Sequence, residues 1–339
     1  MKNDLRKKIL SMFILGYEEE NPPEEFLKLV QDGLGGVIFF TRNIKTKEQF
    51  KAAVKTLKSY EQKDKPLILS IDQEGGRVER TLNIYNGSKY LSAKDSAKKG
   101  IEFVKSQTRE IARELRDFGL NMNFAPVLDV NTNPENPIIA GRAYSSNAQE
   151  VIKFGSAAAQ TYLENGIIPV GKHFPGHGDT SIDSHKAMPV VDLSLEELEN
   201  IHIKPFAALI KKGLVPAIMA AHIHFTAFEK EALPSSISKN VITKYLRNKL
   251  GFEGVVISDD MVMGGIKGFS SFEACTLGIE AGINMFIFRN ADSQTLSLID
   301  KLVEEAEKGN IDISKIDTSI EKIKQTLRAA IYKQRLTNV

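Results

Sequence analysis

The chain of 339 residues is long enough to bury a large hydrophobic core, and 42% of its residues are apolar. Its 45 lysines and arginines nearly balance its 43 aspartates and glutamates, so no overall electric field favours nucleic acid or an acidic membrane surface as a partner. The single cysteine, Cys275, excludes an intramolecular disulfide and a CxxC zinc site. These bounds predict one domain that acts on a small or uncharged partner.

The chain starts with the basic and then apolar stretch MKNDLRKKILSMFILGYEEE. Its apolar run, Ile9 to Leu15, is short and interrupted by a polar residue, and no small-residue cleavage site follows, which argues against a signal peptide. No segment approaches the roughly 20 apolar residues of a membrane-spanning helix. We therefore expect a cytoplasmic protein.

Eight short apolar runs alternate with longer amphipathic stretches, a pattern typical of βα units and a parallel sheet. The runs are MFILG (12–16), GVIFF (36–40), LILSI (67–71), NFAPV (123–127), IPVGK (168–172), AIMAA (217–221), VVISD (255–259) and MFIFR (285–289). Helix candidates include residues 46–62 and 194–213, the second opened by a capping box of Ser194 and Glu197. The pattern predicts the α/β class and a single (β/α)8 barrel of the TIM type over residues 1–339, with helices at its C-terminal end.

A doubly wound open sheet is the main rival architecture. It normally has a glycine-rich turn directly after an early strand. The GLGG segment at 33–36 precedes its strand instead, so the sequence favours the barrel.

Charged or titratable residues follow six consecutive predicted strands, where the active site of such a barrel lies. They are Asp72, Asp129, Lys172 with His173, His222, Asp259 with Asp260, and Arg289. Each has a simpler interpretation: Asp72 as a helix cap or a partner of Arg77, Asp129 as part of a turn, and His222 with His224 as core histidines. Scattered surface charge would not favour one end of every strand, so we expect these residues to form a site.

Residues 172–189, KHFPGHGDTSIDSHKAMP, hold three of the six histidines. His173 and His177 have the spacing of a helical zinc pair, but Pro175 and two glycines make a helix improbable there. A phosphate cradle would need more glycine amides leading into a helix. Asp183 and His185 are two residues apart, so in an extended segment their side chains project to one side, where the carboxylate orients the ring and favours its protonated form. With the strand-end carboxylate Asp259, such a pair supplies the nucleophile and the acid/base that retaining glycoside cleavage requires.

At this point the sequence resembles glycoside hydrolase family 3, in particular its single-domain bacterial β-N-acetylglucosaminidases of cell-wall recycling. The resemblance covers most of the chain. It rests on LGGVIFFTRN (34–43), IDQEGGRVER (71–80), FAPVLDVN (124–131), GRAY (141–144), KHFPGHGDTSIDSH (172–185), MAAHI (219–223) and GVVISDDMVM (254–263).

The resemblance implies a role for each matched residue. Asp259 corresponds to the nucleophile, and Asp183 with His185 to the acid/base dyad. Asp72, Arg142, Lys172 and His173 correspond to residues that hold the sugar hydroxyls, and His222 is predicted to join them as a substrate-binding residue. No metal or cofactor is implied. The implied substrate is a muropeptide with N-acetylglucosamine linked to 1,6-anhydro-N-acetylmuramic acid.

These roles predict a retaining hydrolysis in which Asp259 and the acid/base lie roughly 5 to 5.5 Å apart when engaged. Because a neutral imidazole does not repel anions, phosphate as the acceptor is an alternative to water, and another family 3 β-glycosidase activity is a second alternative. Two rivals come from other classes: a metal-dependent hydrolase that uses His222 and His224, and a sugar-binding protein without catalysis. His224 and Arg289 match no motif with a known role, and for His177 we expect packing or shaping of its loop.

Overall fold

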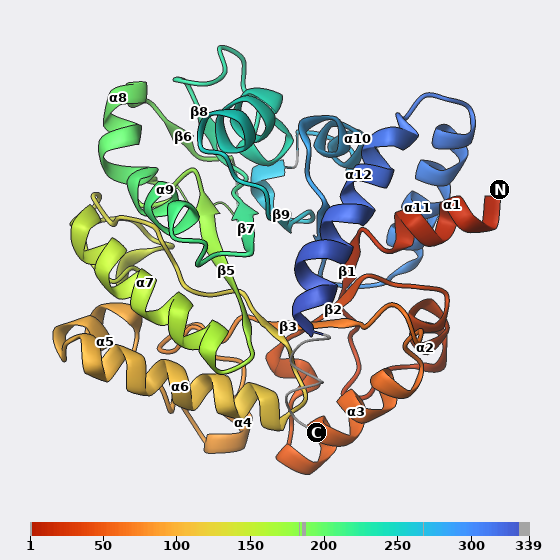
Figure 1. Ribbon diagram of the computed structural model, residues 1–339, viewed down its shortest axis with the longest axis horizontal. Helices are drawn as coiled ribbons and strands as arrows, with labels where there is room; N and C mark the ends of the chain where they lie inside the picture. Colours follow the sequence, from red (N-terminus) through yellow and green to blue (C-terminus); the bar gives the residue numbers. More distant parts are fainter. Residues whose placement is uncertain (1, 183, 185–187, 267, 332–339) are drawn as a thin grey trace.

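The computed structural model describes residues 2–182, 184, 188–266 and 268–331. Eight parallel strands close into a barrel in the order β1-β10-β9-β7-β5-β4-β3-β2 (Figure 1). They are β1 (Phe13–Leu15), β2 (Gly36–Phe39), β3 (Ile68–Ile71), β4 (Met122–Asn123), β5 (Ile168–Phe174), β7 (Ala217–Ala220), β9 (Val255–Asp260) and β10 (Met285–Phe288). Each predicted apolar run contributes one strand, so the predicted (β/α)8 barrel is confirmed.

The largest differences from the predicted strand boundaries are at β4 and β5, whereas the other strands differ by a single residue at one or both ends. β4 has two residues, and an isolated bridge between Val127 and Lys172 follows beyond Pro126. β5 continues to Phe174, two residues beyond its predicted end. A separate two-stranded sheet, β6 (Val190–Val191) and β8 (His224–Phe225), was not predicted.

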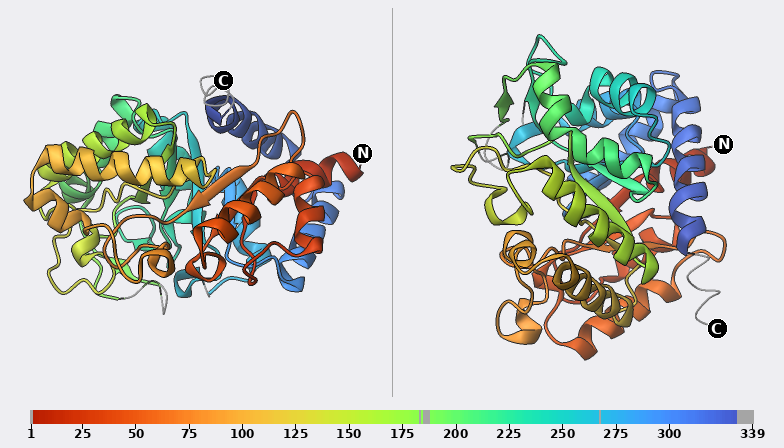
Figure 2. Two further views of the ribbon diagram at one scale, coloured as in Figure 1. Left: turned by 90° about the horizontal axis from the view of Figure 1, so that it is seen from below. Right: turned by 60° about the vertical axis from the view of Figure 1, so that its left-hand side comes forward.

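Helices surround the barrel (Figure 2). They are α1 (Lys2–Leu10), α2 (Glu24–Gln31), α3 (Lys47–Ser59), α4 (Leu82–Tyr85), α5 (Ala93–Lys98), α6 (Ile101–Asp117), α7 (Ala148–Glu164), α8 (Leu195–Glu197), α9 (Lys204–Lys211), α10 (Ser271–Ala281), α11 (Ser293–Glu307) and α12 (Ile313–Ile323). The predicted capping box is confirmed, since Ser194 Oγ accepts from the N–H of Glu197 and the Glu197 carboxylate accepts from the N–H of Ser194. Every helix in the described ranges is too short or too polar to cross a membrane.

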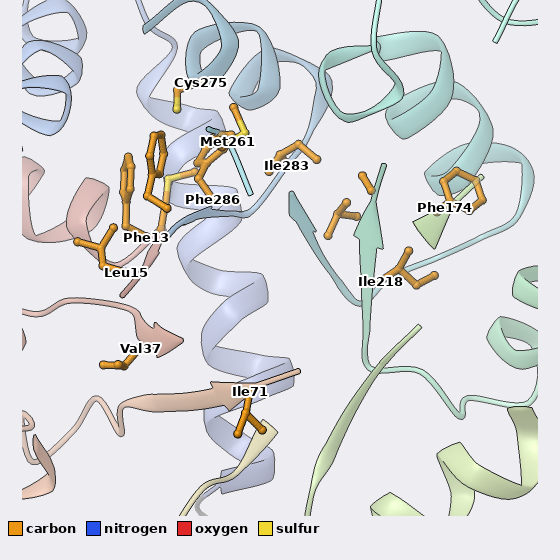
Figure 3. Close-up of a cluster of buried hydrophobic side chains, with 14 of the residues drawn as sticks. Phe13, Leu15, Val37, Ile71, Phe174, Ile218, Met261, Cys275, Ile283 and Phe286 are labelled. Atoms are coloured by element: carbon orange, nitrogen blue, oxygen red, sulfur yellow. The ribbon is translucent and has the colours of Figure 1, made fainter. Parts of the chain in front are cut away.

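Alternation along the strands divides the core into two layers. One set of side chains, including Ile38, Ile68 and Ile287, fills the barrel interior. The other set, shown in part in Figure 3, packs between the strands and the helices, where the rings of Phe13 and Phe286 are 5.9 Å apart.

The C-terminal helix closes one end of the barrel. Ile323, Leu327 and Ile331, in and after α12, pack against the interior layer. Hydrogen bonds from Asn284 to Ser319 and from Lys322 to Glu253 place α12 before the starts of β10 and β9. The mouth at the opposite end, where the strands terminate, therefore remains for a ligand.

Candidate active site

The carboxyl ends of β3 and β5 bring together a buried ionic group at the mouth. The ammonium of Lys172, which is 2% exposed, lies 2.7 Å from Asp72 Oδ1 and 2.6 Å from Glu74 Oε1. Arg142 follows β4 and forms two hydrogen bonds of 2.8 Å with the Glu74 carboxylate. We call Asp72, Glu74, Arg142, Lys172 and His173 the β3–β5 cluster.

His173 is held in one tautomer by its two neighbours. Its Nδ1 lies 2.7 Å from Asp129 Oδ2, and its Nε2 lies 3.3 Å from Arg142 Nη2. Arginine only donates, so Nε2 accepts and the ring proton sits on Nδ1, facing the buried Asp129. The ring of His173 is thereby fixed beside Lys172, in the orientation that a substrate would meet.

The carboxylates around this cluster are ionised. Burial alone would raise the pKa of Asp72 and Glu74, but the charges of Lys172, Arg80 and Arg142 outweigh it and lower both, that of Glu74 to about 2. Burial alone would also raise the pKa of Asp129, but its interaction with His173 outweighs this effect and lowers the pKa to about 2. The site is thus a set of fixed charges that can orient hydroxyl groups.

We expect these lowered pKa values to make folding stability fall in acid. Because their folded-state pKa is about 2 against ordinary values of 4.5 and 3.8, Glu74 and Asp129 stabilise the fold near neutrality and lose that contribution as the pH falls toward 2. Each carboxylate should contribute on the order of 3 kcal/mol to the loss. Urea unfolding at several pH values measures it. Glu74→Gln should weaken the dependence of the unfolding free energy on pH. Glu24→Gln, which removes an exposed partner of Lys28, should leave that dependence unchanged. The same pH dependence in both variants would contradict the low pKa of Glu74.

Asp259 lies at the end of β9 and faces the β3–β5 cluster. Burial alone would raise the pKa of its carboxyl, but its interactions with His173 and His222, the N–H of Asp260 and the Lys172 ammonium together hold it below its ordinary value. That N–H donates to Asp259 Oδ1 at 2.8 Å, which orients the carboxylate. An ionised, oriented carboxylate beside positive groups is suited to nucleophilic attack.

His222 has both ring nitrogens engaged inside the protein. Nδ1 lies 2.6 Å from Ser236 Oγ and Nε2 lies 3.2 Å from the carbonyl oxygen of Asp260, so Nε2 donates and Nδ1 accepts. It is 1% exposed, and burial lowers its pKa. This geometry supports the strand end that carries Asp259; a direct contact of His222 with sugar stays a prediction. Across the described residues, no group of three His, Cys, Asp or Glu side chains is arranged to hold a metal ion.

His177 joins the loop after β5 to Ser184. The Thr180 hydroxyl donates to the carbonyl of His177 and accepts from its Nδ1 at 2.8 Å, so Nε2 accepts from the Ser184 hydroxyl at 2.9 Å. Burial lowers the pKa of His177 to about 4, so the ring is neutral near pH 7. His177 is thus a fixed structural bridge.

Asp183 and His185, the predicted acid/base dyad, lie outside the described residues. Ser184, which stands between them in sequence, is described and buried. Its carbonyl accepts from the N–H of Gly265 at 2.8 Å, in the turn that follows β9. The chain at Ser184 therefore reaches the loop six residues beyond Asp259.

Two residues of the site, Glu74 and Asp129, have roles that the sequence motifs do not indicate. Glu74 pairs with both Lys172 and Arg142, and Asp129 fixes His173 and also accepts from the N–H of His177 at 2.6 Å. Asp129 was noticed at a strand end but has the signature of a turn. Glu74 lies in IDQEGGRVER, two residues after Asp72, a spacing that places both on one side of an extended segment.

Comparison with known proteins adds independent findings. Residues 5–326 match the family model described as the glycosyl hydrolase family 3 N-terminal domain. A β-hexosaminidase of Psychromonas ingrahamii is 35% identical to this chain, and the match covers 85% of this chain and 84% of that protein. β-Hexosaminidase A of Pseudoalteromonas piscicida is 33% identical over 79% of this chain. The structure of a glycoside hydrolase family 3 β-N-acetylglucosaminidase from Paenibacillus sp. superposes on 99% of this chain with a TM-score of 0.89 and is 34% identical in sequence.

Two of these relatives are longer than the matched region. The chain spans 48% of the Pseudoalteromonas protein and 63% of the Paenibacillus one.

Proposed function

Since the chain belongs to glycosyl hydrolase family 3, we propose that it is a retaining β-N-acetylglucosaminidase. The observation that carries the proposal is the ionised carboxylate of Asp259 facing the β3–β5 cluster across the barrel mouth. Charged groups with fixed positions bind sugar hydroxyls, and a carboxylate at the anomeric carbon forms the glycosyl-enzyme intermediate. The names of its relatives, β-hexosaminidase and β-N-acetylglucosaminidase, support the same reaction.

In the proposed first step, Asp259 attacks the anomeric carbon and the leaving oxygen takes a proton. Asp72, Lys172 and Arg142 hold the sugar hydroxyls, so that the anomeric carbon faces the carboxylate. Because Asp259 is ionised and oriented by the N–H of Asp260, attack needs no prior proton transfer from it.

We assign the proton transfers to His185, oriented by Asp183. His185 protonates the leaving oxygen and then activates the water that hydrolyses the intermediate, which gives net retention. The hydrogen bond between Ser184 and Gly265 supports this assignment, because it ties the chain between the two residues to the loop after β9.

We place the substrate among muropeptides, with N-acetylglucosamine at the non-reducing end and 1,6-anhydro-N-acetylmuramic acid as the aglycone, and the protein in cytoplasmic cell-wall recycling. The motif KHFPGHGDT with DSH supports this placement by its resemblance to the single-domain bacterial enzymes. We propose a carbohydrate as the partner, without nucleic acid or membrane.

Chromogenic aryl glycosides test the proposal. We expect hydrolysis of the β-N-acetylglucosaminide to exceed that of the matching β-glucoside by at least about tenfold in kcat/KM. The first product seen by proton NMR should be the β anomer, because two displacements restore the configuration. An α anomer as first product would overturn the retaining mechanism, and activity that disappears with a chelator would favour the metal-dependent rival.

Phosphorolysis is the second candidate, because a neutral imidazole at the acid/base position tolerates an anionic acceptor. Assays in phosphate and in a non-phosphate buffer separate the two. Sugar 1-phosphate as the main product in phosphate would identify a phosphorylase, and free sugar in both buffers a hydrolase.

A further inference from the structure

A second set of charged residues lies around the ends of β2 and β10. Ile38 and Ile287 fill the barrel interior from β2 and β10. Two residues further along each strand, Phe40 and Arg289 have the same alternation and therefore lie at the mouth. Phe40 packs against the interior layer, and Arg289 contacts Asp260, the neighbour of Asp259.

Two arginines lie over the ring of Phe40, and one of them holds the backbone of a third. The guanidinium carbons of Arg42 and Arg80 lie 4.5 and 5.5 Å from the centre of its ring. Arg42 donates at 2.7 Å to the carbonyl oxygen of Arg289. We call Arg42, Arg80 and Arg289 the arginine cluster.

Members of the arginine cluster differ in what already occupies them. Arg42 donates hydrogen bonds to the carbonyl oxygens of Tyr17 and Arg289 and to the side chain of Asn290. Arg80 forms an ion pair with Asp72. Arg289 uses only its Nε, which donates to Asp260 Oδ2 at 2.5 Å. Its two Nη groups have no hydrogen-bond partner among the residues that the structure describes, and its side chain is 43% exposed.

The position of Arg289 suits the group attached to the sugar. In the proposed reaction the hydroxyls lie against β3, β4 and β5, and the anomeric carbon lies at Asp259 on β9. β10 is next to β9 in the barrel, and β1 and β2 follow. A substituent on the anomeric carbon therefore extends toward the side that holds Arg289 and Phe40.

We infer that Arg289, oriented by Asp260, binds a carboxylate on the aglycone. A guanidinium fixed through Nε presents its two Nη groups as a planar fork that matches the two oxygens of a carboxylate. Asp260 holds the fork in place, which reduces the entropy lost on binding. This inference rests on the proposed function and deepens it, because a muramyl aglycone carries such a carboxylate on its lactyl group or peptide.

A pair of nearly isosteric substrates tests the inference: 3-carboxyphenyl and 3-carbamoylphenyl β-N-acetylglucosaminide. The ratio of their kcat/KM values measures selectivity for the charge, and any loss common to both substrates cancels in it. We expect the Arg289→Gln variant to lower this ratio about tenfold, and Arg289→Lys to lower it less, because lysine keeps the charge without the fork. Arg113→Gln, an equal loss of charge on the exposed face of α6, should keep the wild-type ratio.

Each outcome distinguishes the inference from the function on which it rests. An unchanged ratio in Arg289→Gln, with both substrates cleaved, would overturn the inference and leave the proposed function intact. If the wild type cleaves neither substrate, the proposed function fails. If the ratio is unchanged but phosphate competes in an Arg289-dependent way, the fork binds a free oxyanion and the aglycone assignment is wrong.

Discussion

Replacing Asp259 by alanine should lower turnover of an aryl β-N-acetylglucosaminide by about four orders of magnitude or more, because in the proposed reaction this carboxylate forms the glycosyl-enzyme bond. Sugar binding should persist, since the β3–β5 cluster is unchanged. Steady-state kinetics measure the first effect, and titration calorimetry with a non-hydrolysable thioglycoside measures the second.

Azide provides the specific control for Asp259→Ala. A small anion can enter the space left by the carboxylate and attack the anomeric carbon, so azide should restore part of the turnover and give the α-glycosyl azide. Asp260→Asn is the matched neighbour, whose carboxylate contacts Arg289 and the N–H of Val262; it should lose far less activity. Equal losses in the two variants, without rescue by azide, would remove Asp259 from the nucleophile's role.

Replacing Lys172 by methionine should lower the free energy of unfolding by about 3 kcal/mol near pH 7. Methionine fills much of the same volume but leaves Asp72 and Glu74 as neighbouring buried carboxylates without their shared ammonium. Both keep an arginine partner, Arg80 and Arg142 respectively, which limits the loss. Urea unfolding followed by circular dichroism measures the change.

Lys51→Met is the matched control, because Lys51 and Asp117 form an ion pair of the same length, 2.7 Å, with both side chains substantially exposed. It should cost less than about 1 kcal/mol. Adding Asp72→Asn to Lys172→Met should recover part of the stability, since it removes one of the two facing charges. A Lys172→Met protein as stable as the control would mean that the buried charges do not depend on the lysine.

The barrel was predictable because its signal is repeated eight times. Apolar runs of four or five residues mark the strands, and Ser194 with Glu197 marks a helix start that the structure confirms. β4 is shorter than the apolar run NFAPV predicts, because regular pairing stops at Asn123 and resumes only at the isolated bridge of Val127 with Lys172. The sheet of β6 and β8 was not predictable, because strands of two residues are too short to show an alternation of apolar and polar residues.

The placement of Asp72, Lys172 and Asp259 at one rim of the barrel was predictable, because strand ends and motif matches agree there. Glu74 and Asp129 were not assigned, because their roles depend on contacts with residues more than 40 positions away, such as Arg142 and His173. His177 has no role that the sequence alone indicates, because its bond to Ser184, 7 positions away, appears only in the folded loop. The pairing of Arg289 with Asp260 likewise comes from the register of β10 against β9.

The closure of the barrel by Ile323, Leu327 and Ile331 also bears on the order of events during turnover. Because that end is filled by side chains, the substrate and both products enter and leave through the mouth at the other end. In the proposed reaction the aglycone must depart before the second acceptor arrives, and that acceptor enters through the space the aglycone has vacated. An alcohol that fits beside Phe40 and Arg289 would then compete with water for the sugar, so the same side of the mouth would decide whether the protein hydrolyses a glycoside or builds a new one.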